Sequence, residues 1–206
     1  MHVMGGGDVG GAKTQIMNTV TGLNRNNDVM LISFRAGPFA DEARERGIDV
    51  RVIERHNPFR AARTMRDLVD EFKPDIIHCH GWMTALAPLY IKKAYKDEPS
   101  FRDAKVVFSL YDNDFKEPFH PDFASKLLLK GISKKDVADL KEPVDYTALC
   151  KLAVDYSDGV IQQSEHVNEE VIAYARQIGK PVLGYQSPEI FADACNDFYD
   201  QVWGAE

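Results

Sequence analysis

The sequence contains little of what several protein classes require. Only three of its 206 residues are cysteines, and Cys79, Cys150 and Cys195 lie far apart without a C-x-x-C pair. This argues against a disulfide framework or a cysteine metal site and predicts buried thiols. No apolar run approaches the ~20 residues that a membrane-spanning helix needs, and no basic start followed by an apolar segment indicates a signal peptide. We therefore expect a cytoplasmic protein without a membrane span.

Positive charge is also scarce. Lysine and arginine total 25 against 32 acidic residues, which gives a net charge of −7. This balance argues against nucleic acid and anionic membranes as partners. Hydrophobic residues make up 44% and charged residues 28%, as in ordinary globular proteins. A chain of this length can bury a stable core without crosslinks, and we expect a single domain over residues 1–206.

Short apolar runs alternate with helical stretches along almost the whole chain. The predicted strands cover residues 2–4, 28–34, 49–53, 75–79, 105–110, 159–163 and 181–185. Between them apolar residues recur with helical spacing, as Ile16, Val20 and Leu23 do in the first intervening segment. Strands that are apolar on both faces and separated by helices predict βαβ units. With right-handed crossovers these give an α/β fold, a Rossmann-like doubly wound parallel sheet with helices on both faces.

Two segments depart from this alternation. The first predicted strand has only three residues, so we expect the natural start to lie upstream. Residues 111–146 form a long excursion with three prolines, in which 122–130 predicts a short helix and Ser133 followed by Asp136 predicts the cap of another. The excursion follows the fifth strand, at the carboxyl edge of the sheet where open α/β folds bind ligands.

A glycine-rich loop, 5-GGGDVGGAKT-14, joins the first strand to the first helix. Gly5, Gly7 and Gly10 match the dinucleotide fingerprint G-x-G-x-x-G. That mechanism also needs an acidic residue after the second strand, where residues 32–35 contain none. A P-loop is the second interpretation, but one extra residue displaces Lys13 from its place in that motif.

The interpretation that we favour for this loop is a general anion cradle. Backbone N–H groups at a helix start bind phosphate without a fixed motif, and glycine leaves room for the ligand. Gly7 and Lys13 are then the candidate phosphate-binding residues. A tight turn without any ligand is the simpler alternative, although five glycines exceed what a turn needs.

Histidines end the fourth predicted strand, in 74-PDIIHCHGWMTALAPLY-90. Strand alternation places His78 and His80 on one face, with His80 nearer the carboxyl end. A metal site needs more ligands than these two. Two histidines hydrogen-bonded within the sheet edge are a second interpretation. We favour a histidine that lines the same crevice as the glycine loop and hydrogen-bonds a substrate hydroxyl or a leaving group.

These motifs resemble two glycosyltransferase families. The stretches 11-GAKT-14, 36-AGPFADEARERGIDVRVI-53 and 73-KPDIIHCHG-81 resemble the N-terminal half of family 4 glycosyltransferases. From about residue 74, 75-DIIHCHGWMTALAPLYIKKAY-95 is similar to the starch and glycogen synthase signature D-V-V-H-x-H-D-W-x-x-x-L-A-P, and later stretches continue the similarity. Segments 1–73 and 74–206 therefore resemble different families, and our hypothesis is a chimera joined at the fourth strand.

The resemblance implies the N-terminal, acceptor-side domain of a GT-B enzyme, a retaining glycosyltransferase. It implies ADP- or UDP-glucose as nucleotide sugar, a glucan acceptor and no cofactor. By the same resemblance His80 is the candidate catalytic residue, near the transferred sugar. The candidate substrate-binding residues are Gly10, Gly11, Trp82, Asp112, Asn113 and Ser164.

The sequence also departs from the synthase pattern. Lys13 follows the paired glycines, whereas the synthase lysine precedes them, at the position of Asp8. The histidine of the synthase T-x-H-N motif falls on Tyr111. In these synthases the donor domain carries an Arg/Lys pair and an E-x7-E motif. Neither is found in this sequence, whose final predicted helix covers residues 188–203.

We therefore expect no turnover from the isolated chain, because charge stabilisation of the leaving diphosphate is missing. We also expect weak self-association through an exposed cleft face. Two alternatives stay open: a recombined folding scaffold without activity, and a Rossmann nucleotide-binding module or oxidoreductase.

Overall fold

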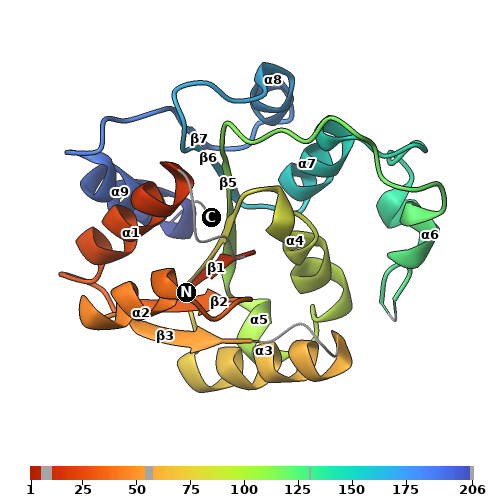
Figure 1. The fold of residues 1–206 in the computed structure, drawn as a ribbon. Helices are drawn as coiled ribbons and strands as arrows, with labels where there is room; N and C mark the ends of the chain where they lie inside the picture. The colour runs from red at the N-terminus through yellow and green to blue at the C-terminus, as the bar shows by residue number, and fades with distance from the viewer. Residues whose placement is uncertain (6–10, 54–57, 130, 205–206) are drawn as a thin grey trace.

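A computed structural model describes residues 1–5, 11–53, 58–129 and 131–204 (Figure 1). Within them, seven strands form one sheet in which all neighbouring strands are parallel. The strands are β1 (His2–Met4), β2 (Met30–Ser33), β3 (Asp49–Val52), β4 (Ile76–His80), β5 (Lys105–Leu110), β6 (Gly159–Gln162) and β7 (Val182–Leu183). Each overlaps a predicted strand, so the predicted α/β class is confirmed.

The strand order is β3-β2-β1-β4-β5-β6-β7. The chain runs outward from β1 to β3 and then returns to place β4 on the other side of β1. The order therefore reverses between β1 and β4, and open α/β sheets bind ligands at the carboxyl ends of such strands. Direct pairing brings His2 opposite His78 and Met4 opposite His80.

Helices connect the strands. The longer ones are α1 (Gly11–Leu23), α2 (Pro38–Glu45), α3 (Pro58–Phe72), α7 (Tyr146–Asp155), α8 (Glu169–Gln177) and α9 (Phe191–Gly204). The shorter ones are η1 (Trp82–Thr84), α4 (Ala87–Leu89), η2 (Tyr90–Ala94), α5 (Pro99–Arg102), α6 (Phe123–Lys126) and η3 (Lys134–Val137). None of the helices in the described part of the chain is long and apolar enough to cross a lipid bilayer.

Apolar side chains fill both faces of the sheet. On one face, residues of α1, α2 and α9 pack around Leu31, Val107 and Ile161. On the other, residues of α3, α4, α7 and α8 pack around Phe108 and Val160. Figure 1 shows α1, α2 and α9 on one side of the sheet and α4 and α7 on the other. The doubly wound arrangement predicted from strands apolar on both faces is thus confirmed.

The first and last long helices lie in close contact. Ile16, Val20 and Leu23 of α1 are buried, as their spacing predicts. Gly22 lies so close to α9 that a Cβ at this position would be 2.4 Å from Ala192 Cβ. A glycine at position 22 therefore permits the contact that fixes α9 against α1.

The excursion after β5 forms short helices. The predicted cap is confirmed: the Ser133 N–H and hydroxyl both donate to Asp136 Oδ2, at 2.8 and 2.7 Å, in a capping box that begins η3. The helix predicted over 122–130 is shorter, ending at Lys126 in α6. Beyond it the chain turns and buries Leu127, while Leu128 and Leu129 stay exposed, so the apolar run is divided between core and surface.

All three cysteine thiols are buried and free, as predicted. Burial raises the pKa of each thiol, Cys79, Cys150 and Cys195, to about 12. These thiols therefore remain protonated at neutral pH and behave as small apolar side chains.

Candidate functional site

The carboxyl end of β4 turns sharply at Gly81. This residue has φ 72° and ψ 174°, a backbone conformation that residues other than glycine rarely adopt. Its N–H donates to the Ser109 carbonyl at 3.0 Å, and the Thr84 hydroxyl donates to the Gly81 carbonyl at 2.9 Å. These bonds attach the turn to β5 and begin η1 immediately after the strand.

Three predicted substrate-binding residues lie near this turn. Asp112 and Asn113 follow β5 and are exposed, and Ser164 follows β6. The Asp112 N–H donates to Ser164 Oγ at 3.2 Å, which joins the ends of β5 and β6. Asn113 Nδ2 lies 3.5 Å from the point where a Cβ on Gly81 would stand. The structure therefore brings the ends of β4, β5 and β6 together, with polar groups facing solvent.

Trp82 is half-buried and belongs to the aromatic packing of the excursion. Its ring packs edge-on against Phe115, with the ring centroids 5.1 Å apart. The Phe115 centroid in turn lies 5.0 Å from that of Phe119 and 5.5 Å from that of Tyr146. Trp82 therefore connects the turn after β4 to residues 111–146. Packing against these aromatic rings accounts for its position without a ligand.

The predicted phosphate-binding residues Gly7 and Lys13, and the predicted substrate-binding residues Gly10 and Gly11, lie only partly within the described residues. Gly7 and Gly10 lie outside the described residues, and Gly11 is the first residue of α1. Lys13 lies on α1 with its ammonium 3.3 Å from the Glu42 carboxylate of α2 and 5.7 Å from the centre of the Phe39 ring. The charge of Lys13 is thus already neutralised by a neighbour.

A small cavity adjoins the same edge. Its volume is about 20 Å³, room for one water molecule, between α1, the end of β6 and the segment before α9. Gln163 lines this cavity and is 2% exposed, and its Oε1 has no hydrogen-bond partner among the described residues.

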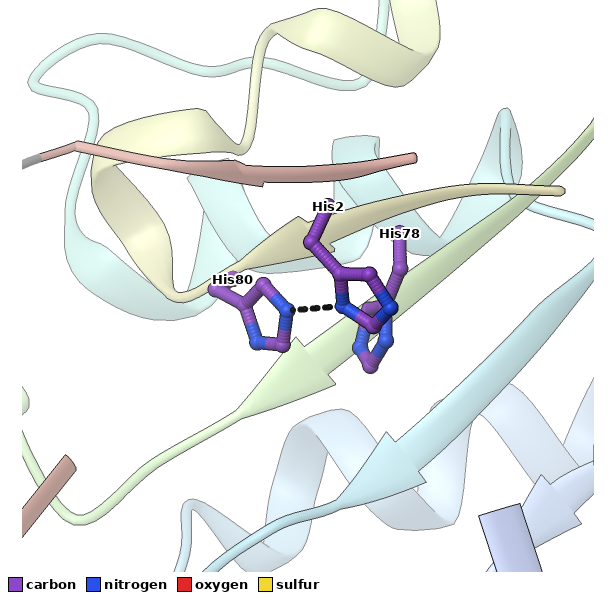
Figure 2. A group of neighbouring side chains, drawn as sticks. All are labelled: His2, His78 and His80. Atoms are coloured by element: carbon purple, nitrogen blue, oxygen red, sulfur yellow. Dashed lines mark hydrogen bonds between the residues drawn. The ribbon is translucent and has the colours of Figure 1, made fainter. Parts of the chain in front are cut away.

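His80 lies beneath this edge, in a group with His2 and His78 that we call the histidine cluster (Figure 2). All three side chains are at most 4% exposed. His2 Nδ1 and His80 Nε2 are 3.0 Å apart, and the rings of His78 and His80 stack with centroids 3.9 Å apart. The prediction that His78 and His80 share one face is confirmed. In this conformation the His80 ring faces protein atoms and cannot contact a sugar.

Hydroxyl groups surround the histidine cluster. His80 Nδ1 lies 2.7 Å from the Tyr111 hydroxyl, which follows β5. His78 Nδ1 and Nε2 each lie 2.5 Å from a hydroxyl, that of Tyr199 on α9 and that of Ser109 on β5. Burial lowers the pKa of His80 to about 3 and lowers the pKa values of His2 and His78 well below the usual range, so the rings are neutral at pH 7.

His2 is the member of this cluster that the sequence analysis missed. The H-x-H pattern of the fourth strand supplies two imidazoles, and the third comes from a strand more than 70 residues away. The predicted strand order could have identified His2, because a doubly wound sheet places the first and fourth strands side by side. His2 precedes the glycine loop on the strand that pairs with β4, in register with His78.

The opposite edge of the sheet carries the largest of the described cavities, about 780 Å³. It lies where β1, β3 and β4 begin and is lined by Met1, His2, Asp75, Tyr199 and Trp203, among others. His2 and Tyr199 thus connect the histidine cluster to this cavity.

Comparisons with known proteins identify the family. The model of the starch synthase catalytic domain matches residues 59–180, more than half of the 206 residues. The glycogen synthase of Desulfitobacterium hafniense is 30% identical over 116 residues, which are 55% of this chain and 23% of that protein. That of Clostridium kluyveri is 28% identical over 137 residues, 66% of this chain and 27% of that protein. The chain therefore spans about a quarter of the length of these relatives.

Solved structures agree with the fold. Anabaena HepE in complex with UDP-glucose superposes with a TM-score of 0.50 and 14% identity, over 95% of this chain and 48% of that chain. The structure of the same protein in complex with UDP superposes with a TM-score of 0.51. Such low identity supports the fold alone. The family match carries the assignment, and the chain belongs to the starch synthase catalytic domain family of glycosyltransferases.

Proposed function

We propose that residues 1–206 form a single Rossmann-like domain, the acceptor-side half of a retaining glycosyltransferase of the glycogen or starch synthase type. The observation that carries this proposal is the family match over residues 59–180, which includes the ends of β4, β5 and β6. The polar groups of Asp112, Asn113 and Ser164 gather at that edge. An exposed carboxylate and neutral hydrogen-bonding groups suit the hydroxyls of a sugar.

A nucleotide sugar, ADP- or UDP-glucose, is the proposed donor, and a glucan is the proposed acceptor. HepE, which shares the fold, was solved with UDP-glucose, and this supports the choice of donor class. The N-terminus of α1 offers backbone N–H groups for a diphosphate. Gly7, Gly10, Gly11 and Lys13 remain the proposed residues for this contact, although the Lys13 ammonium would have to leave Glu42.

His80 and Trp82 stay proposed site residues of different kinds. Trp82 is half-buried beside Gly81 and can line a sugar site without moving. His80 can act on a transferred sugar only if its ring leaves the contacts with His2 and Tyr111. The catalytic role of His80 is therefore a prediction that a ligand-bound state must test.

We further propose that the 206-residue chain turns over negligibly by itself. Transfer from a nucleotide sugar requires positive charge on the leaving diphosphate. Near the start of α1 Lys13 is already paired with a carboxylate, and Asp112 is acidic. The longer relatives have three quarters of their length outside this match.

The test is a glucosyl-transfer assay of the purified chain with radiolabelled ADP-glucose or UDP-glucose and a maltooligosaccharide. We expect no elongation above background. Turnover of about 1 per second, a typical enzyme rate, would contradict the proposed inactivity. Equilibrium dialysis of the same labelled donors and of labelled maltooligosaccharide then tests binding separately, because a folded half-site can bind without turning over. Binding of none of them would contradict the assignment as a half-site.

Three further proposals concern the origin, the self-association and the location of the chain. First, we propose that the chain is a chimera in which residues 1–73 come from a family 4 glycosyltransferase. The match to the starch synthase catalytic domain begins at residue 59, before the proposed junction at about residue 74. One continuous natural gene encoding the chain would contradict recombination. Weak self-association through the exposed cleft face is tested by sedimentation. The cytoplasmic location is tested by cell fractionation.

A further inference from the structure

The histidine cluster gathers three imidazoles from two neighbouring strands. His2 comes from β1, and His78 and His80 come from β4. Parallel pairing sets His2 beside His78, and strand alternation turns all three side chains to the face covered by α1 and α9. One ring nitrogen from each residue lies within 4.8 Å of the other two. Figure 2 shows the three rings grouped together, with the His2–His80 hydrogen bond as a dashed line.

The available ligand atoms select the kind of ion. Three imidazole nitrogens without a carboxylate suit zinc, cobalt, nickel or copper rather than magnesium or calcium, which prefer oxygen. In a tetrahedral zinc site with Zn–N distances of about 2.0–2.1 Å, ligand nitrogens stand about 3.4 Å apart. His2 Nδ1 and His80 Nε2 are 3.0 Å apart. A small widening of this pair and a rotation of His78 would accommodate the ion.

The surrounding hydroxyls provide what two of the three histidines, His78 and His80, need as ligands. A metal-bound imidazole is held in place by a hydrogen bond at its other nitrogen. Tyr111 lies at His80 Nδ1, and Tyr199 and Ser109 lie at the two nitrogens of His78. His78 would keep one of these hydroxyls and turn its other nitrogen to the metal.

The proton balance of binding is simple. In the metal-free protein one proton lies between His2 Nδ1 and His80 Nε2. If His80 carries it, binding moves it to His80 Nδ1, from which it is donated to Tyr111. If His2 carries it, it moves to His2 Nε2. Either way both nitrogens present a lone pair, and no net proton is released from neutral rings.

An ion could reach the cluster through the large cavity at the opposite edge. His2 and Tyr199 belong to the lining of this cavity. Its other lining residues include five carboxylates and a single lysine: Asp28, Asp49, Glu71, Asp75 and Asp200, with Lys73. Asp49 and Glu71 pair with Arg51 at 2.8 and 3.5 Å. The other three carboxylates outweigh Lys73, and a lining with net negative charge raises the local concentration of cations. The cavity can also supply water as a fourth ligand.

We propose that His2, His78 and His80 form a tetrahedral binding site for a divalent ion of the zinc type, with water in the fourth position. The ion would clamp β1 to β4 at the point where the strand order reverses. The role is structural: a metal-bound His80 could not reach a sugar, so the site would exclude the proposed catalytic role of His80 and leave the assignment of the domain unaffected. Its readouts are metal content, spectra and thermal stability, so its failure leaves the proposed function untouched.

The experiment uses protein purified without a histidine tag and stripped with EDTA. Cobalt(II) and zinc(II) are the probes, followed by visible absorption for cobalt and by elemental analysis after dialysis for zinc. We expect one ion per chain and the intense visible bands of tetrahedral cobalt. Zinc at 100 times its Kd should raise Tm by roughly 5–10 °C.

Variants locate the ion. His2→Gln and His80→Gln should each weaken binding at least about tenfold. His120→Gln and His166→Gln remove exposed histidines outside the cluster and should change nothing. No bound metal, or equal losses in the control variants, would overturn the proposal. The histidine cluster would then be three buried imidazoles held by hydrogen bonds alone.

A measurement on the unmutated protein keeps the test decisive if the cluster variants fail to fold. X-ray absorption at the zinc edge counts and identifies the ligands. We expect three imidazole nitrogens at about 2.0–2.1 Å and one oxygen. A shell dominated by oxygen, as surface carboxylates would give, would refute the site.

Discussion

Replacing Gly22 with alanine tests the contact between α1 and α9. A Cβ at position 22 would stand 2.4 Å from Ala192 Cβ, whereas carbon atoms in contact normally stand about 3.5–4.0 Å apart. The two helices must therefore move apart by more than 1 Å or distort. Overpacking of this kind costs about 1–3 kcal/mol. Alanine also favours the helix by up to about 1 kcal/mol over glycine, which offsets part of this cost.

The sharper expectation is a change of sign between two backgrounds. In the natural sequence, Gly22→Ala should lower the free energy of unfolding by about 1 kcal/mol, the difference between the two terms. In an Ala192→Gly background the clash is absent, and the same change should raise stability. The coupling energy from the double-mutant cycle should be about 2 kcal/mol.

Urea unfolding of the four proteins, followed by circular dichroism, measures this coupling. Gly184→Ala is the matched control, because a Cβ there meets nothing within 4 Å and its φ is not positive. It should change stability by less than about 0.5 kcal/mol. A Gly22→Ala effect of the same sign and size in both backgrounds would refute the described packing of α9 on α1.

Three further perturbations follow from local features. Asp145 caps α7 by accepting the Ala148 N–H at 2.8 Å, so Asp145→Ala should cost about 1 kcal/mol in urea unfolding, and an unchanged midpoint would contradict the cap. Gly81→Ala places a side chain at φ 72° and should cost roughly 1–3 kcal/mol, seen as a lower Tm. In EDTA, acid should destabilise the protein, because burial lowers the folded-state pKa values of the histidine cluster below the unfolded value of 6.5. The unfolded state then binds more protons, so stability is full above about pH 6.5 and falls as the pH drops; His80, with a folded-state pKa of about 3, contributes roughly 2 kcal/mol of this loss by pH 5. Equal stability at pH 7 and pH 5 would contradict neutral, buried rings.

The sequence predicts the sheet well because its strands are buried on both faces. Apolar runs such as residues 105–110 can satisfy their side chains only between two helical layers, and the structure places them there. The position of the excursion after β5 and the Ser133 cap follow from equally local chemistry. These features depend on residues close in sequence.

Contacts between distant residues were harder to predict. His2 joins His78 and His80 because of the strand order, and Lys13 pairs with Glu42 because α1 lies beside α2. Residue spacing within a single helix or strand cannot predict either contact. The burial of His80 has the same origin, since Tyr111 and His2 approach its ring from other strands. The sequence pattern located the carboxyl edge but not which side chains at that edge face solvent.

The most direct test of the proposed function is an amide NMR titration of nitrogen-15-labelled protein with ADP-glucose, UDP-glucose, a maltooligosaccharide and NAD. We predict that a sugar nucleotide or the glucan shifts the amides of Gly81, Asp112 and Ser164, and that NAD does not. Asp112→Asn should weaken the response, while Asp67→Asn, at an exposed site on α3, should leave it unchanged. Shifts with NAD alone, or a well-dispersed spectrum that none of the ligands changes, would contradict a glycosyltransferase half-site at this edge.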